Sequence, residues 1–229
     1  MKSARIRIDG IYDKRTLASI FNHQVIDYQF DLRPRSFNFI QEHKLLDIIR
    51  NVDNLLLGRP SFRYFLHFAG EQDYVITKLA SDVKKVIKQN DAIILEFSDA
   101  KEVDFYDSFG TPYFCHYHPL MKLGSFLASP YFSGLVVPYS HLEGLHEQGM
   151  FHNFVKNLLQ VSFGALESGK MELVLALDWD SNVFPSIYDF LDFSLVSLPI
   201  NNKVEVCYRN VDLGGVETGL RHLQSLSQR

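Results

Sequence analysis

The sequence has few of the features that mark several large classes of protein. Its two cysteines, Cys115 and Cys207, lie far apart and outside any Cys-x-x-Cys spacing, which argues against a disulfide framework or a zinc knuckle. No run of about 18 apolar residues is present, so no membrane-spanning segment is predicted. No apolar segment of the signal-peptide kind follows the charged N-terminus. These absences together predict a cytoplasmic protein.

The chain also lacks any long block of one charge. It carries 23 basic and 27 acidic residues, with a formal net charge of −4. A protein that binds the phosphate backbone of DNA or RNA presents a basic face instead. Nucleic acid and membrane are therefore not expected as partners, and a small-molecule ligand is the partner that we predict.

What the sequence does contain is an alternation of two kinds of segment. Its 229 residues, 46% of them hydrophobic, are enough for one substantial core, so we expect a single domain over residues 1–229. Short stretches rich in Ile, Val, Phe and Tyr predict strands near 4–9, 24–31, 63–68, 91–97, 112–118, 133–139, 171–178 and 193–200. Helices are predicted between and after them, at 13–22, 41–56, 71–89, 99–109, 120–128, 147–167, 182–191 and 215–227.

Alternating strands and helices imply parallel strands joined by right-handed crossovers. Eight such units in a chain of this length favour an α/β fold of the closed (β/α)8 type, the TIM barrel, over an open sheet. The stretch "KVEVCYRNV" at 203–211 also has the composition of a strand. A ninth strand has no place in an eightfold ring, so we predict that it elaborates the last loop.

Polar residues recur near the ends of the predicted strands. The first strand carries Arg5, Arg7 and Asp9 on alternate positions, which places them on one face. In a barrel, polar residues late in the strands and on that parity converge on the mouth at the C-terminal end, where such barrels bind their ligands. This rule selects Asp9, Asp31, His67, Glu96, His116 with His118, Tyr139, and Asp178 with Asp180.

Two stretches resemble the phosphoribosylanthranilate isomerases of tryptophan biosynthesis. The segment Arg7-Ile8-Asp9-Gly10-Ile11 is similar to the first strand of that family, which reads roughly Lys-Ile-Cys-Gly-Ile. The segment "FDLRPRSFNFI" at 30–40 is similar to its second-strand loop, Phe-x-Pro-Lys-Ser-x-Arg-Tyr-Ile. The order of the strands matches over the whole chain, whereas the motifs match only in these two regions.

The resemblance implies an Amadori rearrangement, in which the family uses a Cys of strand one as general base and an Asp of strand six as general acid. Matched residue by residue, the base position holds Asp9 and the acid position holds Pro138, which has no proton to give. A carboxylate can act as a base when burial raises its pKa. The loop arginine of the family falls on Asn38, with Arg33 and Arg35 close enough in sequence to replace it.

The phosphate site of the family is also altered. Its glycines at the ends of strands seven and eight are replaced by Asp178, Trp179 and Asp180, and by "FSLVSLPINN". The stretch "LGGVE" at 213–217 resembles a phosphate loop by its letters but comes late in the chain. Ordinary phosphoribosylanthranilate isomerase activity is therefore expected to be weak or absent.

Two hypotheses follow from these residues. In the first, the chain is a divergent isomerase for a small sugar-derived or anionic metabolite, with Asp9, His116 and His118 as catalytic candidates. Its substrate-binding candidates are then Arg7, Asp31, Arg33, Arg35, His67, Glu96, Tyr139, Asp178 and Asp180. In the second, it is a non-catalytic barrel that binds a small molecule or a protein.

Less specific interpretations stay open as well. Asp9 can be a structural acid paired with Arg7 or Arg33, and His116 and His118 can be packing residues or, on one strand face, metal ligands. His67 and Asp178, with Gln29 or Asp31 of the second strand, resemble part of the metal site of ribulose-phosphate epimerases, whose second-strand His is missing here. A metal-dependent enzyme similar to the sugar-phosphate epimerases is therefore a further alternative. We predict no cofactor and no metal, and a monomer or homodimer.

Overall fold

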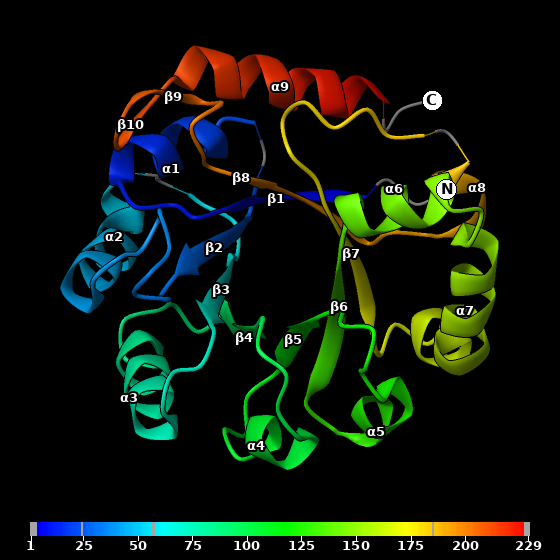
Figure 1. Cartoon of the computed structure of the whole chain (residues 1–229). Helices are drawn as coiled ribbons and strands as arrows, with labels where there is room; N and C mark the ends of the chain where they lie inside the picture. Colours follow the sequence, from blue (N-terminus) through cyan, green and yellow to red (C-terminus); the bar gives the residue numbers. More distant parts are fainter. Residues whose placement is uncertain (1–3, 24, 56–57, 185, 227–229) are drawn as a thin grey trace.

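The chain forms a closed barrel of eight parallel strands with helices around it (Figure 1). The computed structural model describes residues 4–23, 25–55, 58–184 and 186–226; the predicted element positions 24, 56, 185 and 227 lie outside these ranges. Neighbouring strands pair in sequence order, and the first strand pairs with the last. The strands are β1 (Arg5–Asp9), β2 (Asp27–Asp31), β3 (Arg63–Phe68), β4 (Ala92–Phe97), β5 (Tyr113–His116), β6 (Phe132–Pro138), β7 (Glu172–Ala176) and β8 (Leu195–Pro199). The predicted (β/α)8 fold is confirmed.

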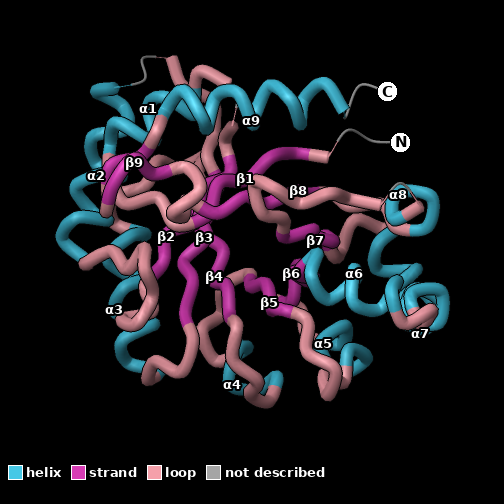
Figure 2. Tube along the Cα trace, turned by 45° about the horizontal axis from the view of Figure 1, so that its top comes forward, coloured by secondary structure: helices cyan, strands magenta, loops and turns pink. Residues whose placement is uncertain are grey.

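The helices lie outside the ring of strands (Figure 2). They are α1 (Lys14–Phe21), α2 (Glu42–Leu55), α3 (Asp73–Lys84), α4 (Val103–Asp107), α5 (Leu123–Ala128), α6 (Tyr139–Glu147), α7 (Phe151–Glu167), α8 (Ile187–Phe190) and α9 (Leu213–Leu226). None of the helices in the described part of the chain is long and apolar enough to cross a membrane.

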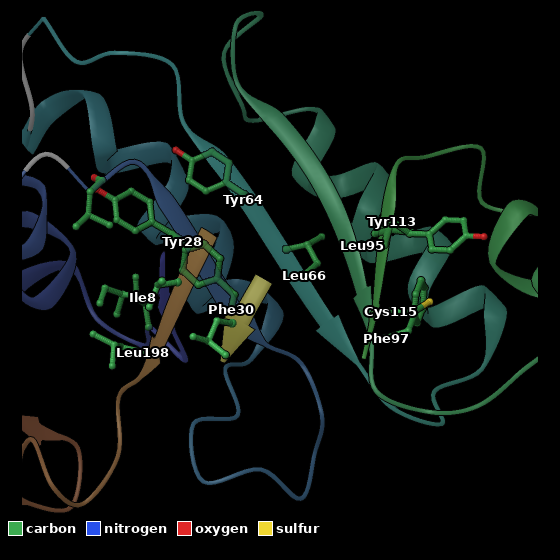
Figure 3. Packing of buried hydrophobic residues seen from close by; sticks show 14 of the residues in the cluster. Ile8, Tyr28, Phe30, Tyr64, Leu66, Leu95, Phe97, Tyr113, Cys115 and Leu198 are labelled. Carbon is green, nitrogen blue, oxygen red and sulfur yellow. The ribbon is translucent and has the colours of Figure 1, made fainter. Parts of the chain in front are cut away.

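One face of each strand packs against these helices. Side chains such as Ile8, Tyr28, Leu66 and Leu95 are fully buried in this outer layer of the core, part of which is drawn in Figure 3. Since successive side chains of a strand point to opposite faces, the residues between them point into the barrel. The apolar alternation that identified the strands is the pattern of this outer layer.

The interior of the barrel is filled in three levels. At the N-terminal end, Arg63 pairs with Asp27 and with Glu172, which also binds Arg5 at 2.6 Å. The middle level is apolar and consists of Phe65, Ile94, Phe114, Val136, Val174 and Leu195. Gly134 leaves room for the Phe114 ring, which would lie 2.5 Å from a Cβ at that position. The third level is polar and faces the C-terminal end.

The structure differs from the sequence prediction after β6. The predicted strand extended to residue 139 and was followed by one helix at 147–167, whereas Tyr139 begins α6 and the long helix α7 begins at Phe151. Gly149, with a φ of 69°, ends α6 in the left-handed conformation that favours glycine. No helix was predicted from the sequence at residues 139–147, because the segment is short and contains Gly144.

A small hairpin stands outside the ring, as predicted for residues 203–211. Its strands β9 (Glu205–Cys207) and β10 (Asn210–Val211) pair with each other in antiparallel fashion. Glu205 accepts a hydrogen bond of 2.5 Å from the Tyr12 hydroxyl, and Asn210 accepts one of 2.9 Å from Arg15. The hairpin therefore lies beside the loop and helix that follow β1.

Candidate active site

A cavity of about 530 Å³ opens at the C-terminal ends of the strands. The loops after β1, β2 and β8 form most of its wall, and strands β2, β3 and β5 contribute polar side chains to it. The lining residues are Asp9, Gly10, Gln29, Asp31, Arg33, Ser36, Phe37, Asn38, His67, His116, Pro199, Ile200, Asn201 and Asn202. This is the end of a parallel barrel where ligands bind.

A buried arginine organises the floor of the site. Arg7 is completely buried, and its Nε and Nη2 donate to the two carboxylate oxygens of Asp9 at 2.6 and 3.0 Å. Its Nη1 and Nη2 donate to the carboxylate of Glu96 at 2.5 and 3.3 Å. The guanidinium also lies 4.7 Å from the centre of the Phe65 ring, at the top of the apolar level. One cation is thus shared between two carboxylates.

The two carboxyl groups that share Arg7 have pKa values shifted in opposite directions. Burial raises the pKa of Asp9, and the negative charge of Glu96 raises it further, although Arg7 acts in the opposite direction. Burial alone would also raise the pKa of Glu96, but Arg7 and the hydrogen bond from His116 bring it well below its usual range. Glu96 therefore stays ionised, while Asp9, whose side chain is 18% exposed, is the better proton acceptor.

Glu96 orients His116. The Nε2 of His116 lies 2.9 Å from Oε1 of Glu96, and since an ionised carboxylate only accepts, this nitrogen carries the proton. Nδ1 of His116 has no hydrogen bond to any residue that the structure describes, and the side chain is 25% exposed at the cavity. A buried carboxylate that holds one nitrogen of an imidazole leaves the other free to exchange protons with a ligand.

His118 lies elsewhere. Strand β5 ends at His116, and His118 is exposed, with its Nδ1 accepting a bond of 3.2 Å from the Leu120 amide. It is not among the residues that line the cavity. The strand alternation that placed both histidines on one face stops before the second of them.

His67 is held in one tautomer by a chain of hydrogen bonds. The amide N–H of Gly10 donates to Oε1 of Gln29 at 2.8 Å, so the Nε2 of Gln29 faces Nδ1 of His67 at 2.7 Å. Gln29 is then the donor and Nδ1 the acceptor, which leaves the ring proton on Nε2. That Nε2 is buried and has no partner within the described residues. Burial lowers the pKa of His67 to about 3, so the ring is a neutral donor.

The two imidazoles stack, with ring centres 4.9 Å apart and planes 15° from parallel. His67, Glu96 and His116 each offer a ligand atom within 4.8 Å of the others, a grouping that could hold a metal ion. The hydrogen bonds do not fit that role, because Nδ1 of His67, which lies 3.9 Å from Oε1 of Glu96, already accepts from the Gln29 amide, and Nε2 carries the ring proton. His67 therefore carries a hydrogen-bond donor, Nε2–H, that has no partner among the described residues.

Asp31 and Arg33 form a second pair in the wall. Arg33 donates through Nε and Nη2 to the two oxygens of Asp31 at 2.8 and 2.6 Å, and Ser36 also donates to this carboxylate. Burial would raise the pKa of Asp31, but these donors lower it. Arg35 is exposed and lines an adjoining cavity, which shares Arg33 and Ser36 with the first and also contains Glu71.

The acids of strand seven lie to one side. Asp178 accepts from Asn201 at 2.9 Å and from Lys203 at 2.6 Å, and Lys203 also pairs with Asp180, which is exposed. Neither acid lines the cavity, although Asn201 does. His67 and Asp178, which resemble part of an epimerase metal site in the sequence, therefore have different hydrogen-bond partners. Tyr139 is buried, with its hydroxyl donating to the Asn182 carbonyl oxygen at 2.6 Å.

Asn38 was not predicted as a ligand-binding residue. Its Nδ2 donates to the Ile200 carbonyl oxygen, and its side chain packs against Gly10, whose φ of 78° and missing Cβ make room for it. Gln29 had no predicted role beyond that of an alternative to Asp31 in the epimerase comparison, although Gln29 shares the strand parity of Asp31 and was recognisable by that rule. Asn38 lies in a loop, where no periodicity points to it.

The comparisons with known proteins agree with this architecture. No family model and no curated protein matches the sequence. Among solved structures, phosphoribosylanthranilate isomerase from Thermotoga maritima is similar with a TM-score of 0.64, at 14% identity over 97% of this chain and 99% of that one. The isomerase from Thermus thermophilus gives 0.63 at 12% identity, with the same coverage of both chains. N-acetylneuraminate lyase from Fusobacterium nucleatum gives 0.59 at 11% identity, over 99% of this chain and 76% of that one.

The fold and the cavity define a (β/α)8 barrel with two carboxylates and two histidines at its mouth. At these identities, the likeness to phosphoribosylanthranilate isomerase is one of fold.

Proposed function

We propose that this chain is an isomerase-like enzyme that moves a proton beside the carbonyl group of a small molecule bound in the mouth of the barrel. The observation that carries the proposal is the joint placement of Asp9, His67 and His116 on the cavity, with Asp9 and His116 both tied to the buried Arg7–Glu96 pair. A proton shift of this kind needs a base for carbon, a donor for the carbonyl oxygen and a group that returns a proton.

Asp9 supplies the base, because its pKa is raised by burial and its carboxylate is partly open to the cavity. His67 supplies the donor to the carbonyl oxygen through Nε2–H. A neutral imidazole suits this task, since it polarises the oxygen without a full charge to desolvate. His116 moves a proton to or from a neighbouring oxygen through Nδ1, while Glu96 stabilises the positive charge that the ring takes up.

The test is proton exchange with solvent. The purified protein is incubated in deuterated water with aldoses, ketoses and their phosphate esters, and loss of the proton signal beside the carbonyl is followed by NMR. We expect exchange with at least one compound, lowered about 10²- to 10⁴-fold in Asp9→Asn and in His116→Gln, the usual range for loss of a general acid or base.

His118→Gln makes the same chemical change at the exposed histidine two residues further along and separates the two histidines as catalytic candidates. Exchange that survives both Asp9→Asn and His116→Gln, or that depends on His118 instead, contradicts the proposal.

A further inference from the structure

We propose that the cavity binds a neutral, unphosphorylated polyhydroxylated ligand of the free-sugar class. This inference rests on the proposed function for the same site and specifies its substrate class. Three observations support it. The cations of the site are already paired with acids, two buried polar atoms lack hydrogen-bond partners among the described residues, and aromatic side chains lie at the rim.

The cations in the lining and in the floor of the cavity are already paired with acids. Among the described residues that line it, Arg33 is the one with a permanent positive charge, and it is bound through two nitrogens to Asp31. Arg7, beneath the floor, is divided between Asp9 and Glu96. A phosphate dianion would therefore meet the carboxylates of Asp9 and Asp31 with no uncommitted guanidinium in the lining to offset them.

The ends of β7 and β8 do not compensate for this lack of an unpaired cation. Parallel barrels commonly hold phosphate at the loops after strands seven and eight, with a helix N-terminus directed at it. Here Lys203 is paired with Asp178 and Asp180. Gly214 and Gly215 lie in the first turn of α9, where the Asp212 carboxylate already accepts the Gly215 amide proton at 3.1 Å. The Asn201 side-chain amide, the Lys203 ammonium and the Gly215 amide at this edge each donate to an acid of the chain itself.

Two of the lining residues each have one buried polar atom that lacks a partner, and the two atoms are of opposite kinds. Oδ1 of Asn38 is an acceptor and Nε2–H of His67 is a donor, and neither has a hydrogen-bond partner among the residues described. Both residues are more than nine-tenths buried. A phosphate dianion only accepts hydrogen bonds and cannot satisfy Asn38. A ligand with a hydroxyl and a carbonyl oxygen satisfies both atoms.

The rim adds an aromatic surface. Phe37 lines the cavity with 46% of its surface exposed, and its ring meets that of Tyr208 edge to face, with centres 5.5 Å apart. An exposed ring presents a negative π face, against which the C–H groups of a sugar ring can pack. Tyr208 belongs to the hairpin after β8, so this segment supplies part of the sugar-facing rim.

The test compares matched pairs of ligands on the full-length protein. Binding of the common aldopentoses, aldohexoses and 2-ketoses is measured by ligand-observed NMR, beside the terminal phosphate ester of each and beside inorganic phosphate. We expect at least one free sugar to bind at least about tenfold more tightly than its ester, a difference of about 1.4 kcal/mol. Inorganic phosphate should not displace it. This comparison is made on the unmodified chain and depends on no variant.

Asn38→Leu should abolish binding of that sugar, whereas Asn153→Leu, the same change at an exposed position of α7, should leave it unaltered. The inference is overturned if none of the free sugars binds, if an ester binds more tightly than its sugar, or if inorganic phosphate competes. A sugar that binds without proton exchange in deuterated water supports the inference and contradicts the proposed function. Proton exchange that occurs only with a phosphate ester supports the proposed function and contradicts the inference.

Discussion

At the scale of residues, one buried cation, Arg7, influences the protonation of two carboxyl groups in the site. Arg7 is the only cation in direct contact with Asp9 and Glu96 among the described residues, and it leaves the two acids with opposite shifts of pKa. Replacing one partner of a buried ion pair leaves an uncompensated charge, which costs about 3–5 kcal/mol. The arrangement therefore fixes Glu96 as an anion that orients His116 and leaves Asp9 to accept protons.

His67 gives the protein a pH-dependent stability. Its pKa in the folded state is about 3, against an ordinary 6.5, so below pH 6.5 the unfolded chain binds a proton that the folded chain does not. The free energy of unfolding should then fall as the pH drops from 6.5 toward 3, by about 1.4 kcal/mol per pH unit once the unfolded-state imidazole is fully charged. Above pH 6.5 this contribution is constant.

Urea unfolding at a series of pH values measures this effect. The comparison variant is His67→Asn, which keeps an acceptor near the position of Nδ1 but has no group that titrates. Asp31 and Glu96 remain in both proteins, so the difference in slope isolates the histidine. Parallel slopes for the two proteins would show that His67 is not held neutral.

At the scale of elements, the loop after β1 depends on a glycine that serves two purposes. Gly10 has a φ of 78°, and its amide begins the hydrogen-bond chain to Gln29 and His67. A Cβ at this position would lie 2.8 and 2.9 Å from Cγ and Cβ of Asn38. The turn therefore sets the tautomer of one site residue and the position of another.

Gly10→Ala should destabilise the protein by about 1–3 kcal/mol through the left-handed backbone, with a further cost from displacing Asn38. The matched control is Gly144→Ala in the middle of α6, where a Cβ meets no atom within 4 Å. That change should stabilise by up to about 1 kcal/mol, because alanine is the better helix former. Urea unfolding of the two variants checks both signs, and equal effects would refute the account of Gly10.

At the scale of the whole molecule, the chain shares its fold with phosphoribosylanthranilate isomerases. One solved structure of that enzyme is described as a complex with a reduced carboxyphenylamino-deoxyribulose 5-phosphate. In this chain, β6 ends at Pro138, and the loops after β7 and β8 carry the Asp178–Lys203–Asp180 cluster. Pro138 has no proton to give, and the Lys203 ammonium is already paired with two acids.

We therefore expect this chain not to restore growth of a tryptophan auxotroph that lacks phosphoribosylanthranilate isomerase. Loss of a general acid alone lowers a rate about 10²- to 10⁴-fold, and loss of phosphate anchoring removes binding energy that positions the sugar. The isomerase of Thermotoga maritima, expressed from the same vector, serves as the positive control. Robust growth that disappears in Asp9→Ala would contradict the expectation and show that the altered site still performs the family reaction.

The sequence by itself determined the strands and their parallel order, because alternation of apolar side chains is a local property. The exclusion of residues 203–211 from the ring followed from the count of eight strand–helix units. The sequence also brought Asp9, His67 and His116 to one end of the barrel, since strand parity is local as well. Only the tertiary structure decided how these groups interact. Arg7 meets Glu96 across 89 residues, the position of Gln29 fixes the tautomer of His67, and Asp178 is bound by Lys203 beside the cavity. These outcomes depend on distances between strands and loops far apart in the chain, and therefore on closure of the ring.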